Sequence, residues 1–161
     1  MASKDQYEFF RGLYEEEERT AEQLESRAKV YLGIITAFLV AILLKTDDVI
    51  KSGELLKVPF PLILTEAIFL SAALVCVIFA LRIRAYEAVN DGVAIIEDYK
   101  GSGPTEEEFY EDRIADYAYA SSRNRGLNNE TAKVLAWSAW LILSGMLVLL
   151  VLAILSLWSH R

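Results

Sequence analysis

Few residues in this chain have the types and spacing that catalysis or metal binding requires. His160 is the only histidine and Cys76 the only cysteine, so a histidine-rich metal site, a Cys–His pair and an intrachain disulfide all lack their materials. The sequence also contains no HExxH, CxxC, GxSxG or P-loop pattern. We therefore expect a protein that is not an enzyme and that holds neither a cofactor nor a metal.

Charged residues gather in polar segments, where two groups call for a chemical interpretation. The EEEE block at Glu15–Glu18 is interpreted as a solvated helix face, because neighbouring helical positions point about 100° apart and cannot converge on one ion. Arg113, Arg123 and Arg125 suit contacts with a phosphate ligand or a partner. Salt bridges to the surrounding acids are the more common explanation for such arginines.

Glu66 is the ionisable residue inside an apolar run that begins at Phe60 and ends at the basic residues Arg82 and Arg84. If a helix enters lipid at Phe60, Glu66 lies about 9 Å inside and is a candidate functional intramembrane acid. If the apolar core begins at Ala67 instead, Glu66 lies at the wet boundary. The sequence favours the boundary position and leaves both open.

Three apolar runs dominate the chain. Residues 134–158 carry no charge over 25 positions, and about 20 apolar residues suffice to cross a bilayer. Residues 60–83 form the second candidate transmembrane helix. Residues 30–44 form a first run of only 15 positions, which can span if Lys29 and Lys45 extend outward to the interface. A re-entrant or interfacial helix is the alternative for this first run.

Composition agrees with these runs. Hydrophobic residues make up 54% of the 161 positions and charged residues 24%, and the two kinds occupy separate blocks. A net charge of -7 disfavours nucleic acid as a partner, since phosphate binding needs a basic surface. We predict an all-α integral membrane protein with three transmembrane helices and cytoplasmic helical extensions that form a short bundle.

The distribution of Lys and Arg predicts the orientation. Twelve basic residues fall in or beside segments 1–29 and 84–133, against four in segment 45–59 and at the C-terminus. Basic residues concentrate on the cytoplasmic side of membrane proteins. We therefore expect a cytoplasmic N-terminus, a short external loop at 45–59 and an external C-terminus.

The polar segments are predicted to be helical. Residues 1–29 carry a stripe with alternating spacings of three and four, in which Glu17 is the single defect. Residues 84–133 are predicted to form a helical hairpin, whose first helix continues the second span and whose turn lies at Gly101–Pro104. Thr105 and Glu108 read as a capping box. The GLNN sequence at 126–129 either kinks the second helix or continues directly into the third span. Together these segments predict a short antiparallel bundle.

Small residues recur every four positions in the first two spans, and such stripes let membrane helices approach closely. We predict helix packing there, with a homo-oligomer as one consequence. The residues are Gly33, Ala37, Ala41, Ala72, Cys76 and Ala80.

The stretches LESRAKVYLGIITAFLVAILL (Leu24–Leu44), RIRAYEAVNDGVAIIEDY and NRGLNNETAKVLAWSAW (Asn124–Trp140) carry a resemblance to a known group. The chain resembles small bacterial membrane effectors of anti-phage systems, the SLATT class and the transmembrane effectors of Pycsar-type systems. The resemblance implies an effector in the bacterial inner membrane that oligomerises or opens when a partner or signal triggers it. The alternative is a membrane anchor or adaptor that recruits a soluble cytoplasmic protein through its acidic bundle.

Overall fold

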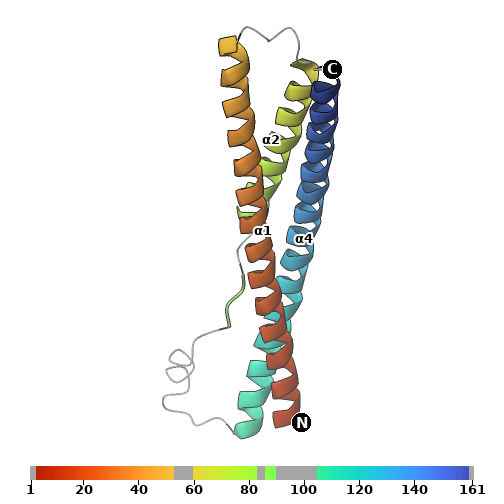
Figure 1. Ribbon diagram of the computed structural model, residues 1–161. Coiled ribbons are helices and arrows are strands. Elements are labelled where there is room, and N and C mark those ends of the chain that lie inside the picture. Colours follow the sequence, from red (N-terminus) through yellow and green to blue (C-terminus); the bar gives the residue numbers. More distant parts are fainter. Residues whose placement is uncertain (1–2, 53–59, 83–85, 90–104, 160–161) are drawn as a thin grey trace. The chain divides into compact units, whose positions relative to one another are not determined.

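The computed structural model describes residues 3–52, 60–82, 86–89 and 105–159, and their side chains except those of 45–52, 60 and 156–159. The helices in this part of the chain are α1 (Lys4–Ser52), α2 (Phe60–Arg82) and α4 (Glu106–Ser159), shown in Figure 1. The described residues contain no strand. All three helices are long and apolar enough to cross a membrane. The predicted all-α membrane fold is confirmed.

The chain divides into two compact units. Unit 1 comprises Met1–Leu24 and Ile83–Glu130, and unit 2 comprises Glu25–Arg82 and Thr131–Arg161. Because α1 and α4 are unbroken, each contributes its N-terminal part to unit 1 and its C-terminal part to unit 2. Helix α2 belongs to unit 2 alone.

Unit 2 is a three-helix bundle in which α2 runs antiparallel to the parallel pair α1 and α4, as three successive crossings require (Figure 1). Its interior is formed by one stripe on each helix, with spacings of three and four residues that keep one face inward. The buried residues are Ala28 and Ile35 of α1, Glu66, Leu70, Ala73, Val77 and Ala80 of α2, and Thr131, Leu135, Ser138, Ile142 and Gly145 of α4.

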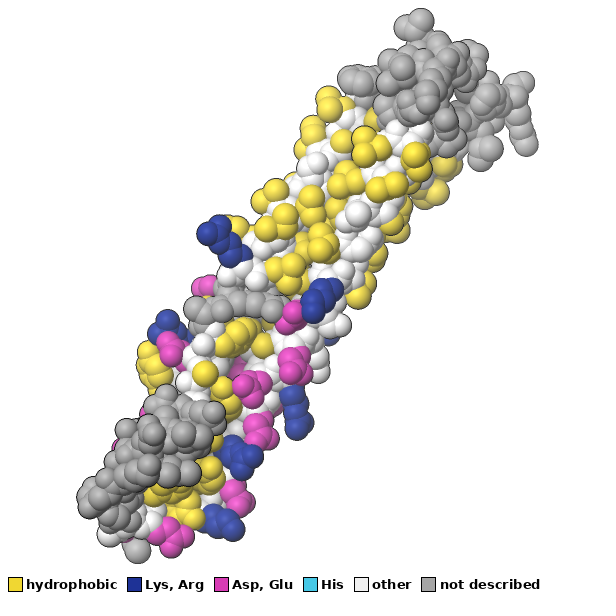
Figure 2. All heavy atoms as spheres, turned by 90° about the vertical axis from the view of Figure 1, so that its left-hand side faces the viewer, with side chains coloured by type: hydrophobic (Ala, Val, Ile, Leu, Met, Phe, Trp, Pro, Cys, Tyr) yellow, Lys and Arg dark blue, Asp and Glu magenta, His cyan; other side chains and the backbone are white. Residues whose placement is uncertain are grey.

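The outer surface of unit 2 is apolar. In the most apolar 18-residue windows of α1, α2 and α4, only 11%, 22% and 17% of the residues are buried. Except for Phe9 and Tyr119, every large exposed hydrophobic side chain that the structure describes belongs to unit 2. On the face that Figure 2 shows, hydrophobic side chains predominate over unit 2, whereas acidic and basic side chains gather over unit 1. Apolar patches of this extent require a non-aqueous neighbour, so the chain is a membrane protein with three candidate spans.

Helices α2 and α4 approach closely at small residues. The Ser138 hydroxyl donates a hydrogen bond to the Ala73 carbonyl oxygen at 3.2 Å. A Cβ atom placed on Gly145 would lie 3.5 Å from Cδ2 of Leu70, an ordinary van der Waals contact. The interface therefore has room for one methyl group at Gly145 and for little more.

A substitution at Gly145 tests this close approach. We expect Gly145→Ala to leave stability nearly unchanged and Gly145→Phe to lower the free energy of unfolding by about 1–3 kcal/mol, the usual cost of overpacking. The matched control is Leu147→Phe, because Leu147 is exposed on the same helix. Unfolding in detergent micelles, followed by circular dichroism, measures the difference. Equal stability of the two Phe variants would contradict the packing described.

In unit 1, α1 and α4 run parallel, and tyrosines join their N-terminal parts. The ring centroids of Tyr7 and Tyr110 lie 5.6 Å apart, those of Tyr7 and Tyr117 5.8 Å, and those of Tyr14 and Tyr117 5.6 Å. Between the Tyr7–Tyr110 and Tyr14–Tyr117 contacts both partners advance by seven residues, which is the repeat of a parallel coiled coil. The heptad-like stripe predicted for residues 1–29 therefore faces α4.

The structure differs from the sequence-based expectations at two places. Residues 86–89 are not helical, so the helix expected to continue the second span does not include them; the rest of the segment expected to form the first helix of the hairpin lies outside the described residues. Helix α1 extends to Ser52, so much of the segment predicted as an external loop at 45–59 is helical. The expected turn at Gly101–Pro104 lies outside the described residues.

Helix α4 confirms two other features. Its start is a capping box: the Thr105 amide donates to Glu108 Oε2 at 2.9 Å, and the Glu108 amide donates to Thr105 Oγ1 at 3.3 Å. The helix passes through residues 126–129 without a break, so the direct continuation into the third span is correct and the kink is not formed. Gly126 has no neighbouring atom within 4 Å of its added Cβ position.

The capping box makes the first turn of α4 sensitive to acid. Hydrogen bonds from the Thr105 amide and hydroxyl lower the pKa of Glu108. A lowered pKa means that this stabilisation is complete above the ordinary carboxyl pKa and is lost as the pH falls through the lowered value. We expect the Glu108 amide to lose protection from hydrogen exchange in that range, and Thr105→Ala to abolish the effect. A Glu108 carboxyl that titrates at or above its ordinary pKa would contradict this assignment.

Candidate functional site

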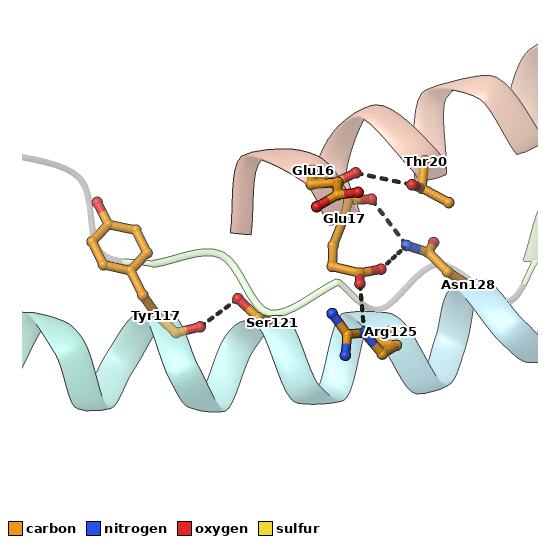
Figure 3. A network of polar contacts seen from close by, with 7 residues as sticks. All are labelled: Glu16, Glu17, Thr20, Tyr117, Ser121, Arg125 and Asn128. Atoms are coloured by element: carbon orange, nitrogen blue, oxygen red, sulfur yellow. Dashed lines mark hydrogen bonds and ion pairs between the residues drawn. The ribbon is translucent and has the colours of Figure 1, made fainter. Parts of the chain in front are cut away.

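The most elaborate polar arrangement in the described structure surrounds Glu17, in the interior of unit 1. Glu17 is only 8% exposed. Its Oε1 accepts a hydrogen bond from Arg125 Nε at 2.8 Å, and its Oε2 accepts one from Asn128 Nδ2 at 2.9 Å (Figure 3). Asn128 Nδ2 also donates to the Glu17 carbonyl oxygen at 2.9 Å. The carboxylate of α1 is thus held by two side chains that lie one turn apart on α4.

Asn128 connects this carboxylate to a third segment. It is 3% exposed, and its Oδ1 accepts a hydrogen bond from the Tyr86 hydroxyl at 2.5 Å. Its amide therefore donates to α1 with one end and accepts from the non-helical segment 86–89 with the other. Because every polar atom of this side chain is engaged, Asn128 fixes three parts of unit 1 at one level.

Asn124 holds the same segment one turn earlier on α4. Its Oδ1 accepts from the Glu87 amide at 3.1 Å, and its Nδ2 donates to the Glu87 carbonyl oxygen at 3.3 Å. This amide pairs with the backbone as a neighbouring strand would, which satisfies groups that a helix would otherwise have satisfied internally. The Glu87 side chain adds an ion pair with Arg123 at 2.9 Å. These contacts explain why residues 86–89 can remain non-helical.

We name Glu17, Arg125, Asn128, Asn124 and Tyr86 the polar layer. Buried polar groups are costly when unpaired and specific when all are paired, so a complete layer selects one register of α1 against α4. A change that removes one member leaves others buried without partners.

Electrostatics within unit 1 follow from these contacts. The hydrogen bond to Glu17, followed by the attraction between the two charges, raises the pKa of Arg125 and keeps it charged. The hydrogen bond to Tyr119 and the charge of Glu87 raise the pKa of Arg123. Burial is the main cause of the raised pKa values of Tyr14 and Tyr117. These tyrosines thus remain neutral packing groups at physiological pH.

The three arginines singled out in the sequence have different surroundings. Arg123 and Arg125 form intrachain ion pairs, as the more common explanation expected. Arg113 is 7% exposed, and its Nη2 lies 3.1 Å from Asp116 Oδ2. Its Nε and Nη1 have no hydrogen-bond partner among the described residues. No group of three His, Cys, Asp or Glu side chains in the described part of the chain is arranged to hold a metal ion.

Glu17 itself was misread from the sequence. The sequence pattern predicts a defect in the heptad-like stripe at this position and a place on the solvated EEEE face. The flanking Glu16 and Glu18 are indeed exposed, but Glu17 is buried. The signal was present, because a polar residue at a core position of a heptad repeat commonly specifies register. The sequence does not predict the partners of Glu17, because Arg125 and Asn128 lie more than one hundred positions away.

The small-residue stripes of unit 2 are used unequally. Ala80 is buried, Ala72 and Cys76 are half-buried, and Gly33, Ala37 and Ala41 are exposed on α1. The last three therefore make no close helix packing within the described chain. The residues that do, Ala73 and Ser138, were not singled out in the sequence.

Glu66 is the buried acid of unit 2. Helix α2 begins at Phe60, and Glu66 is 1% exposed on the inward stripe of that helix. Its Oε1 has no hydrogen-bond partner among the described residues.

Searches against protein-family models, curated proteins and solved structures found no match to this chain.

Proposed function

We propose that this protein is a membrane effector of a bacterial defence system, which opens or oligomerises in the inner membrane when a partner or signal acts on unit 1. In this proposal unit 1 is cytoplasmic, as the distribution of Lys and Arg favours. The resemblance to small anti-phage membrane effectors supplies the class of function. The polar layer is the observation that carries the mechanism.

The polar layer supports this proposal because four of its five residues lie on helices that also contain candidate membrane spans. Helices α1 and α4 extend without interruption from unit 1 into unit 2. Glu17 joins them through Arg125 and Asn128. A partner that separates this carboxylate from α4 changes the relation of two membrane helices at the same time. A simple anchor needs neither a buried carboxylate in its polar part nor a polar group inside its membrane bundle, whereas Glu17 provides the first and Glu66 the second.

Recording the membrane potential tests the proposed function. The protein is expressed in a bacterial host together with its genomic neighbours, and a voltage-sensitive dye follows the potential after phage infection. We expect depolarisation and growth arrest that depend on the protein. An unchanged potential in infected cells that contain the folded protein would contradict the effector role.

The exposed acids of unit 1 favour a second candidate function, a membrane adaptor. Residues 106–108, 111, 112 and 116 at the start of α4 are acidic and exposed. Such a surface would attract a basic soluble partner and release it as salt screens the charges. Co-purification of a basic protein at low but not high ionic strength, with no change in membrane potential, would favour this adaptor over the effector.

A further inference from the structure

Glu66 occupies a place in unit 2 where an ionised carboxylate has little support. It lies one turn before Leu70, which contacts Gly145 of α4. From the start of α2 at Phe60, about 1.5 Å per residue places Glu66 roughly 9 Å along the helix axis. With 1% exposure and an unpartnered Oε1, the carboxyl group faces the bundle interior and neither water nor lipid.

The described charged side chains of unit 2 lie far from this position. Arg82 is at the other end of α2, about 24 Å away at about 1.5 Å per residue. Segments 30–44 of α1 and 134–155 of α4 contain no Asp, Glu, Lys, Arg or His. The one titratable side chain in these two segments is that of Tyr31. On α2, the other titratable side chain near the middle of the helix is that of Cys76. The charged side chains at the end of α1, those of Lys45, Asp47, Asp48 and Lys51, lie outside the described side chains.

An isolated ionised carboxylate in such an interior is costly, because neither water nor a cation offsets its desolvation. The neutral acid avoids most of this cost and can donate its own hydrogen bond. A metal ion is a poor alternative, since hard cations need several oxygen ligands and the surrounding span segments supply no second carboxylate.

We propose that Glu66 is a proton-binding site inside the membrane unit: it carries a proton while the bundle is closed and releases that proton when opening admits water. The carboxylic O–H bond breaks at Glu66, the proton passes to water, and the carboxylate left behind becomes hydrated. The protonation of the closed bundle does not depend on the proposed function. The release on opening rests on the proposed function and identifies the permeant or regulatory ion as the proton.

Infrared spectroscopy of the full chain in liposomes tests the protonation. Exposed carboxyl groups, with ordinary pKa values of about 4, are ionised at pH 8. We expect a carbonyl stretching band of a protonated carboxylic acid at pH 8, present in the wild type and in Glu66→Asp and lost in Glu66→Gln. The control Glu130→Gln, at an exposed site on α4, should keep the band. Absence of the band from the wild type, or its persistence in Glu66→Gln, would overturn the proposal; a carboxylate paired with Lys45 gives the first of these results.

A flux measurement separates this site from the proposed function. The Glu17→Arg variant, which places a second cation beside Arg125, serves as the opened form, and a pH-sensitive dye inside the liposomes reports proton entry. We expect proton flux in Glu17→Arg and its loss in the double variant that also carries Glu66→Gln. Proton flux that survives Glu66→Gln overturns the role of Glu66 in opening. The infrared band together with a silent Glu17→Arg variant would support the proton site and contradict the effector.

Discussion

Replacing Asn128 with Leu is expected to lower the free energy of unfolding of unit 1 by about 3–5 kcal/mol. The substitution removes the partner of the Tyr86 hydroxyl, of the Glu17 carbonyl oxygen and of one Glu17 carboxylate oxygen. A buried polar group left unpaired costs about 1–3 kcal/mol, and charged groups cost more. Leu has the same number of side-chain heavy atoms as Asn and the same branch at Cγ, so the substitution opens no cavity.

The neighbouring residue provides a matched control. Asn129 is exposed on the same turn of α4, so Asn129→Leu changes the same chemical group without touching the polar layer. Denaturant unfolding in detergent micelles, with tyrosine fluorescence as the signal, measures unit 1 through its tyrosine cluster. Asn128→Leu and Asn129→Leu with equal stability would show that Asn128 is hydrated in solution, contrary to the polar layer.

The second large effect is expected from Glu17→Arg. This substitution should change the activity of the protein in cells and not only its stability. This variant replaces the buried acid Glu17 by a cation that faces Arg125. The attraction between α1 and α4 at this position therefore becomes repulsion. If the polar layer holds the membrane unit closed, Glu17→Arg depolarises cells and arrests growth without any trigger. The reciprocal change Arg125→Glu in the same chain restores an ion pair and should largely restore growth.

The EEEE block supplies internal controls for this second prediction. Glu16→Arg and Glu18→Arg make the same change of charge at exposed positions beside Glu17. Membrane potential and protein level are measured for the three single Glu→Arg variants and for the double variant that combines Glu17→Arg with Arg125→Glu. Depolarisation by Glu16→Arg or Glu18→Arg to the same extent would show that net charge, and not the polar layer, controls the protein.

The membrane unit was predictable because its signals are local. Each span is a continuous apolar run, and the capping box at Thr105 needs only residues three positions apart. The heptad-like stripe likewise predicted the buried face of α1, where Leu24 and Ala28 are buried. Periodicity decides which side of a helix faces inward, and all of these features depend on periodicity or on neighbours in the chain.

The polar layer was not predictable for the opposite reason. Its contacts join Glu17 to Asn128, and Asn124 to Glu87, across long stretches of sequence. The helical pattern of residues 86–89 was also overridden, because Asn124 satisfies the backbone of Glu87 without a helix. Propensity cannot foresee such a tertiary replacement of helical hydrogen bonds. The position of Glu66 was left open because an apolar run does not reveal which face of its helix points inward.

The central claim, that unit 2 lies in lipid and unit 1 in water, is tested most directly by two cysteine substitutions. Tyr119 of unit 1 and Leu147 of unit 2 are both 61% exposed, so only the surrounding solvent distinguishes them. In a Cys76→Ala background reconstituted in lipid nanodiscs, a water-soluble maleimide should label Tyr119→Cys quickly. Leu147→Cys should react only after denaturation in SDS. Equally fast labelling of both cysteines in lipid would contradict the account.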